Sequence, residues 1–223
     1  MTDENKTYVS PAVLVREFHE TYGQPIRTEP VFDVPERQLR VELILEEASE
    51  YYEANKENDL YEMADALADL LYVAYGAALT HGIDIDASFG NTPEESPVIK
   101  VAMAMAASRS KINGLPTLKV FTRSAIARGI NKTAVNYAEV AKNGGTVEGL
   151  RKALVSIVSS CYSASLSLGI NIDEVLLEVQ RSNMSKLGED GKPIYREDRK
   201  VLKGPNFFVP DIAKVLKEQK SMV

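Results

Sequence analysis

Six carboxylates crowd into two short stretches that otherwise have the apolar spacing of helical core. Residues 42–53 read ELILEEASEYYE, and residues 62–69 read EMADALAD. The acids concerned are Glu46, Glu47, Glu50, Glu62, Asp65 and Asp69. A helix turns about 100° per residue, so the three acids named from each stretch fall on one side of their helix. Two neighbouring helices can therefore aim two acidic faces at each other.

Facing acids of this kind predict a divalent cation site. Like charges repel more strongly where water is scarce, and a bound cation removes that penalty. Ligation by carboxylates without histidine or thiolate favours a hard ion, Mg²⁺ or Mn²⁺, whose open positions suit substrate phosphates and an attacking water. The alternative is an ordinary solvated acidic face. The same stripes are apolar one and two turns away, at Leu39, Leu43 and Val73, and this favours a cavity.

Two other carboxylate sites fit the pattern less well. A di-iron bundle requires Glu-x-x-His on two helices, and no Glu in the chain is followed by His three residues later. A glycosidase-type acid/base pair would explain two carboxylates but not six.

Composition excludes several classes of protein. The net charge of −6 and the pI near 5.2 leave no basic surface for nucleic acid, so we expect no nucleic-acid partner. The single cysteine, Cys161, excludes an internal disulfide and a cysteine zinc cage. The sequence shows neither a signal peptide nor an apolar run long enough for a membrane span, so we expect a cytoplasmic protein with no membrane partner.

Helical periodicity dominates the chain and predicts an all-α fold. We expect helices near residues 10–21, 36–54, 59–81, 97–110, 121–142, 146–168, 171–185 and 210–219. Loops are expected at 23–35 and 89–97. The segment 188–207 is rich in glycine, proline and charge, which indicates a short hairpin, an ordered tail or a flexible flap.

The chain also carries an internal repeat. Residues 59–86 align without gaps over residues 146–173, with nine identities in 28 positions. At this offset of 87 the six acids become Thr133, Ala134, Tyr137, Gly149, Lys152 and Ser156. The repeat predicts a duplicated helical bundle with pseudo-twofold symmetry. We expect an acidic unit at 1–92, a second unit without the acids at 93–187, and a segment at 188–223 that packs on or closes the site.

The two acidic motifs, LEEASEY (45–51) and ADALADLLYVAYGAALTHGID (64–84), resemble the all-α nucleoside triphosphate pyrophosphohydrolases. This superfamily includes MazG-like proteins, phosphoribosyl-ATP pyrophosphohydrolase and the dimeric dUTPases. The opening VREFHETYGQPI (15–26) and the closing stretch 178–212 resemble a MazG-like subfamily related to dimeric dUTPases. The resemblance implies hydrolysis of a nucleoside triphosphate between its α and β phosphates, on a small deoxynucleotide such as dUTP or dCTP. A nucleotide-binding or interaction module that has lost catalysis is the alternative.

The resemblance also implies roles for the acids. Glu47, Glu50 and Asp69 would hold Mg²⁺, and Glu46 would orient or deprotonate the attacking water or bind a further ion. The second motif has two possible alignments. Either Asp69 pairs with Asp65, or Glu62 and Asp65 form the usual Glu-x-x-Asp with Asp69 as an extra ligand.

Substrate contacts are implied outside the acidic motifs. Asn183 and Lys186, in the stretch RSNMSK, would contact phosphate or sugar. Lys192, Tyr195 and Lys203 would close over the triphosphate. His19 either packs in its helix or contacts the nucleotide. Superfamily members are usually dimers, so the fused chain either suffices alone or pairs again as a homodimer.

Overall fold

Seven α-helices and no strand form the part of the chain that the computed structural model describes, residues 9–88 and 116–221. The helices are α1 (Pro11–Thr21), α2 (Arg37–Glu57), α3 (Leu60–His81), α5 (Pro116–Lys142), α6 (Val147–Leu168), α7 (Ile172–Asn183) and α8 (Ile212–Ser221). A single 3₁₀ turn, η1, covers Asp86–Ser88. The all-α prediction is confirmed. The helix expected at 97–110 lies outside the described residues.

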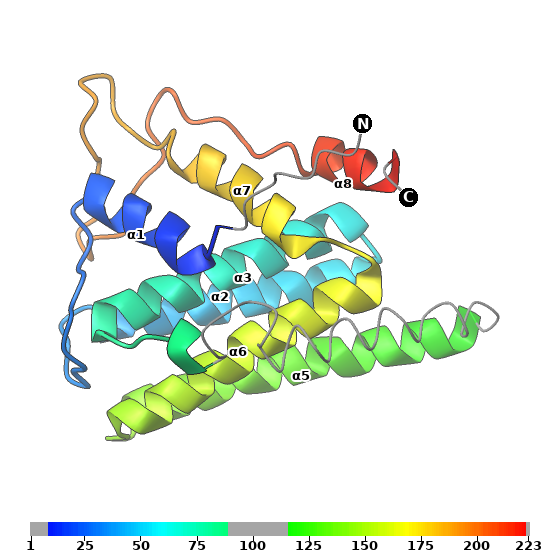
Figure 1. The fold of residues 1–223 in the computed structure, drawn as a ribbon, viewed down its shortest axis with the longest axis horizontal. Coiled ribbons are helices and arrows are strands. Elements are labelled where there is room, and N and C mark those ends of the chain that lie inside the picture. Colours follow the sequence, from blue (N-terminus) through cyan, green and yellow to red (C-terminus); the bar gives the residue numbers. More distant parts are fainter. Residues whose placement is uncertain (1–8, 89–115, 222–223) are drawn as a thin grey trace.

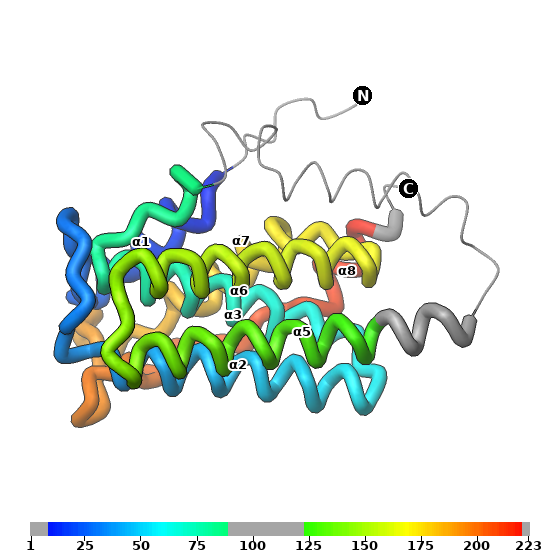
Figure 2. Tube along the Cα trace, turned by 90° about the horizontal axis from the view of Figure 1, so that it is seen from below, coloured from blue at the N-terminus to red at the C-terminus, as the bar shows by residue number. Residues whose placement is uncertain are grey.

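Four long helices, α2, α3, α5 and α6, form a bundle with their axes side by side (Figure 2). α2 packs on α3 and α5, and α6 packs on α3 and α5. α1 and α7 cover the opposite side of α3, and α8 packs at the end of α7 (Figure 1). α3 is therefore the central helix of the molecule.

The composition of α3 explains its central position. Most of its residues are apolar or small, so it has no broad polar face, and 16 of its 22 residues are buried. The Asp59 side chain caps its first turn by accepting hydrogen bonds from the amides of Tyr61 and Glu62. Gly82 ends the helix at φ +66°, where a Cβ atom would stand 2.2 Å from the Glu29 carbonyl oxygen. Only glycine fits this close turn.

The two helical hairpins correspond residue by residue. α6 begins and ends 87 positions after α3, and both helices end in a left-handed glycine, Gly82 or Gly169. The Tyr75 hydroxyl donates to Asp86 at 2.7 Å, and at the equivalent place Tyr162 donates to Asp173 at 2.8 Å. These correspondences agree with the sequence repeat. The duplication itself and the division at residues 92 and 187 stay predictions.

The segment between α7 and α8 is irregular. Two isolated antiparallel bridges, Leu187 to Pro193 and Tyr195 to Val201, are its only ladder contacts in the described residues. The Tyr195 hydroxyl donates to the backbone carbonyl of Tyr22 at 2.8 Å and ties the segment to the end of α1. This connection brings residues 200–203 back toward α2 and α3.

Within the described residues, no single helix is long and apolar enough to cross a membrane. One pair, α6 with α7, passes the same length and composition test only when joined across a bend of 113°.

Candidate active site

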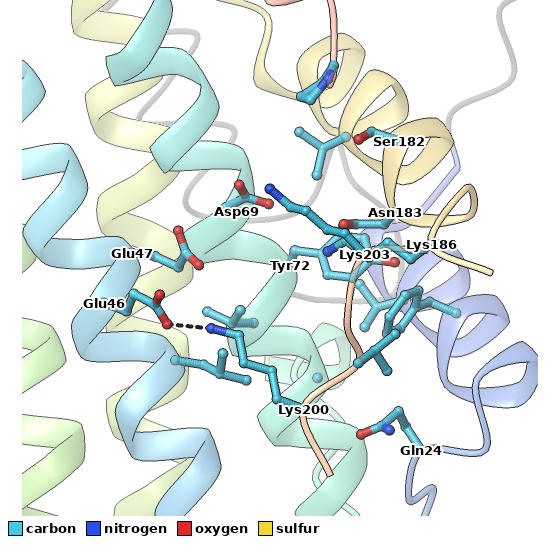
Figure 3. A pocket seen from close by; sticks show the side chains of 18 of the residues that line it. Gln24, Glu46, Glu47, Asp69, Tyr72, Ser182, Asn183, Lys186, Lys200 and Lys203 are labelled. Carbon is cyan, nitrogen blue, oxygen red and sulfur yellow. Dashed lines mark hydrogen bonds and ion pairs between the residues drawn. The ribbon is translucent and has the colours of Figure 1, made fainter. Parts of the chain in front are cut away.

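One cavity of about 350 Å³ collects most of the predicted site residues. α2 and α3 form one wall, and α1, the end of α7 and the segment after α7 form the other (Figure 3). The acids come from the first wall, whereas three lysines come from the second.

Five of the six predicted acids line this cavity. Glu46, Glu47 and Glu50 reach it from α2, and Asp65 and Asp69 reach it from α3. The apolar stripes continue around them as expected, because Leu39, Leu43 and Val73 also line the cavity. Glu62, the sixth acid, is exposed in the first turn of α3 and is not part of the lining. Asp65 and Asp69 thus share the cavity wall, whereas Glu62 lies outside it.

Burial and mutual repulsion make the acids hold protons more tightly than usual. Burial, followed by Glu62 and Glu50, raises the pKa of Asp65 to about 6. Burial is also the largest cause of the raised pKa of Glu47 and of Asp69, with the neighbouring carboxylates adding to it. The pKa of Glu50 is raised by burial and by Glu46. A cluster of this kind is strained when every member is ionised.

The opposite wall carries positive charge. Lys186, Lys200 and Lys203 line the cavity, and Lys200 Nζ pairs with a carboxylate oxygen of Glu46 at 2.8 Å (Figure 3). Burial lowers the pKa of Lys186, and Asp69 opposes that effect. Lys200 was not among the predicted residues. The sequence offers one indication that Lys200 belongs to the site, its position three residues before Lys203. The chain around it is irregular, so no helical or strand periodicity predicts which way its side chain points.

The end of α7 is fixed firmly. The buried Tyr22 hydroxyl donates to the carbonyls of Asn183 and Met184, at 3.0 and 2.9 Å. Asn183 and Lys186 thus reach the cavity from an anchored helix end. Two predicted contacts, Lys192 and Tyr195, are exposed and lie outside the lining. Tyr195 instead anchors the segment that carries Lys200.

Three polar residues line the cavity at its other end. His19, Gln24 and Arg40 are all buried there, and only His19 was predicted. Arg40 and Gln24 carry no motif of their own. An arginine at a position of α2 that is otherwise apolar was the one available sign.

The carboxylate ligands suit a hard divalent cation, although in the described residues they do not yet stand at the spacing of an ion site. Among the described residues, no three His, Cys, Asp or Glu side chains stand close enough to form a complete ion site. Nevertheless Asp65 Oδ1 is buried without any hydrogen-bond partner, and such an oxygen is stabilised by a cation. The carboxylates around it offer oxygen ligands only, the kind that Mg²⁺ and Mn²⁺ prefer.

Comparison with known proteins identifies the family. The family model of phosphoribosyl-ATP pyrophosphohydrolase matches residues 15–94, which include every acid of the cavity wall. The chain belongs to this family. The family is part of the MazG-like all-α nucleoside triphosphate pyrophosphohydrolases, which commonly use divalent metals. The predicted relationship is therefore confirmed, and it supports a pyrophosphohydrolase-type activity, that of a hydrolase acting on anhydrides.

A relative from a giant virus extends the similarity beyond the matched range. The uncharacterized protein L479 of Acanthamoeba polyphaga mimivirus is 34% identical over 185 residues, covering 78% of this chain and 69% of its own length. No solved structure gives a significant match.

Proposed function

We propose that the chain is a Mg²⁺- or Mn²⁺-dependent nucleoside triphosphate pyrophosphohydrolase that releases pyrophosphate and a nucleoside monophosphate. One observation carries the proposal: a single cavity sets five carboxylates on one wall against three lysines on the other. A metal-bound triphosphate needs both kinds of wall, since the acids hold the cation and the lysines meet the phosphate oxygens. A metal-stabilised scaffold would need only the acids.

The carboxylates divide into holding and orienting groups. Glu47, Glu50, Asp65 and Asp69 would hold the cation, which when bound polarises the phosphate oxygens and lowers the pKa of water. Glu46 lies one residue before Glu47 and already pairs with Lys200. When phosphate takes over that lysine, Glu46 is free to orient the attacking water and accept its proton.

The lysine wall of the cavity would bind the phosphates and neutralise their negative charge. Lys186, Lys200 and Lys203 would contact the phosphates and offset the negative charge that develops on them. Asn183, which lines the cavity at the end of α7 and three residues before Lys186, would donate to phosphate or sugar oxygens. The resemblance of the opening and closing stretches to a subfamily related to dimeric dUTPases favours a small deoxynucleotide, dUTP or dCTP, as substrate.

The test is pyrophosphate release from a panel of ribo- and deoxynucleoside triphosphates with Mg²⁺, with Mn²⁺ and with EDTA. Glu47→Gln keeps the shape of the side chain and removes its charge, so turnover should fall below detection. Glu139→Gln makes the same change on the exposed side of α5 and should leave turnover intact. Nucleotide binding without pyrophosphate release under either metal would refute the proposal and identify a binding module instead.

A further inference from the structure

Arg40 is a buried cation at the end of the cavity, and it lacks an acidic partner. Its exposed fraction is 5%, yet it lines the cavity. Its Nε–H has no hydrogen-bond partner, and among the described residues no carboxylate forms an ion pair with it. Within the described part of the chain its side chain makes one hydrogen bond, a long one from Nη2 to Gln24 Oε1 at 3.3 Å. A buried guanidinium left this way is stabilised by any acceptor that enters the cavity.

A hydrogen-bond acceptor stands beside it. His19 Nδ1 lies 2.8 Å from the carbonyl oxygen of Pro25, which can only accept, so Nδ1 carries the hydrogen. Burial, with Arg40 second, lowers the pKa of His19 to about 3, so the ring is neutral and Nε2 keeps its lone pair.

A glycine lets both groups approach α3. A Cβ atom at Gly76 would stand 3.2 Å from His19 Nε2 and 3.3 Å from Arg40 Nη1. The two nitrogens therefore flank one point on the helix surface. A donor and an acceptor therefore lie next to each other in the wall of the cavity.

This pair matches the edge of a nucleobase better than it matches a phosphate. Phosphate oxygens only accept at neutral pH, so the lone pair of His19 Nε2 would repel them. A cyclic amide edge presents an N–H beside a C=O and satisfies both groups at once. We infer that Arg40 and His19 form a base-reading subsite that selects keto bases, with Arg40 donating to the carbonyl oxygen and His19 Nε2 accepting from the ring N–H.

The distance to the acids suits a nucleotide. Arg40 precedes Glu47 on α2 by seven residues, and Gly76 follows Asp69 on α3 by seven. Seven residues make about two helical turns, so the Arg40 and Gly76 end of the cavity lies about 10 Å from the Glu47 and Asp69 end at 1.5 Å per residue. The apolar residues Leu43 and Val73 line the cavity between these levels. In Figure 3, Gln24 marks the far end of the cavity from Asp69. A base at one end and phosphates at the other leave the apolar middle to the sugar.

Amino bases meet the same groups with the wrong polarity. Cytosine in the pose of uracil would turn a ring lone pair toward His19 Nε2 and an amino group toward Arg40. Adenine would do the same in the pose of guanine. Unpaired polar groups in a buried site discriminate strongly between such analogues. We therefore expect uracil, thymine and guanine to be preferred over cytosine and adenine.

The inference rests on the proposed function for the position of the phosphates, but its test is binding rather than turnover. The probes are α,β-imido analogues of dUTP and dCTP, with dGTP and dATP analogues as the second pair and inorganic triphosphate as the base-free control. Affinities are measured by calorimetry in Mg²⁺ for the wild type, Arg40→Met and Gly76→Ala. Arg128→Met, on the exposed side of α5, is the matched arginine control.

The wild type should bind the keto member of each pair more tightly. Arg40→Met should weaken the dUTP analogue about 10- to 100-fold, the range of one hydrogen bond to a charged group, and leave inorganic triphosphate within about twofold. Gly76→Ala keeps both groups but displaces them by a few tenths of an ångström, and it should reduce the keto preference without abolishing phosphate binding. Arg128→Met should match the wild type.

Two results would overturn the inference. One is equal affinity of the wild type for keto and amino analogues, which does not depend on any variant folding. The other is an Arg40→Met variant that weakens triphosphate as much as the dUTP analogue, which would make Arg40 a phosphate or scaffold residue. A keto preference that depends on Arg40 in a protein that releases no pyrophosphate would uphold the subsite and refute only the catalytic proposal.

Discussion

Neutralising Asp65 should stabilise the metal-free protein. Burial and the neighbouring Glu62 and Glu50 raise the pKa of Asp65 from 3.8 to about 6 in the folded state. The folded chain therefore binds this proton more tightly than the unfolded chain does. The stability gained from protonation is complete below pH 3.8 and is lost as the pH rises through about 6. Asp65→Asn makes the charge-free form permanent.

The pKa values give the size of the effect. The difference between 3.8 and about 6 corresponds to about 3 kcal/mol at 1.36 kcal/mol per pH unit. At pH 8 Asp65 of the wild type is ionised and contributes none of this protonation-linked stability. The free energy of unfolding of Asp65→Asn should therefore exceed that of the wild type by up to about 3 kcal/mol. At pH 5 the wild type has recovered about 1.4 kcal/mol, so the advantage of the variant should shrink to about half.

Urea unfolding in EDTA at pH 5 and pH 8 measures this difference. Far-UV circular dichroism is the suitable signal because the fold is helical and the chain has no tryptophan. Glu139→Gln, an acid-to-amide change on an exposed helix face, is the control and should shift stability by less than about 0.5 kcal/mol. The reasoning fails if Asp65→Asn is no more stable than the wild type at pH 8, or if both show the same change between the two pH values.

Three further outcomes are expected. Mg²⁺ at 100 times its dissociation constant should stabilise the wild type at pH 8 by about 2.7 kcal/mol, and thermal unfolding of Glu47→Gln should show little of this gain. Lys200→Gln should lower kcat/KM about 10- to 100-fold in steady-state assays, while its melting temperature stays near that of the wild type because the pair with Glu46 is partly exposed to solvent. Gly204→Ala places a methyl group 2.0 Å from the Leu187 carbonyl oxygen, so it should displace the lysine segment and raise KM for the triphosphate, measured beside the helical circular dichroism signal as a fold control.

Local signals predicted the helices well where the chain supplies caps and periodicity. α3 begins after the capping Asp59 and ends at Gly82, close to the predicted ends. α2 runs to Glu57, three residues past its predicted end at 54, because Asn58 adopts the left-handed conformation (φ 60°) that ends the helix. Asparagine is a weaker sequence signal for this ending than glycine.

In the candidate site, too, the residues on regular helices could be predicted better than those on the irregular segment. The acids of α2 and α3 could be predicted because helical spacing fixes which side chains share a face. The basic wall depends on an irregular segment that returns across the molecule, so no periodicity could place Lys200 inside the cavity or Lys192 outside it. Arg40 was missed for a different reason. A single arginine within a mostly apolar stretch of α2 belongs to no motif, and only the packing of α1 and α3 shows that it is buried.

Packing of the second hairpin explains why, in the part of the chain that the structure describes, the acids gather on α2 and α3 and not at the equivalent positions of α5 and α6. At the positions equivalent to Glu47 and Glu50, α5 carries Ala134 and Tyr137, and both are fully buried. Acids there would be buried as unpaired charges, whereas alanine and tyrosine pack. The Tyr137 hydroxyl is itself buried without a partner, and the Arg40 guanidinium is close enough to act on its pKa. The second hairpin thus supports α2 from behind, and its tyrosine borders the arginine of the inferred base-reading subsite.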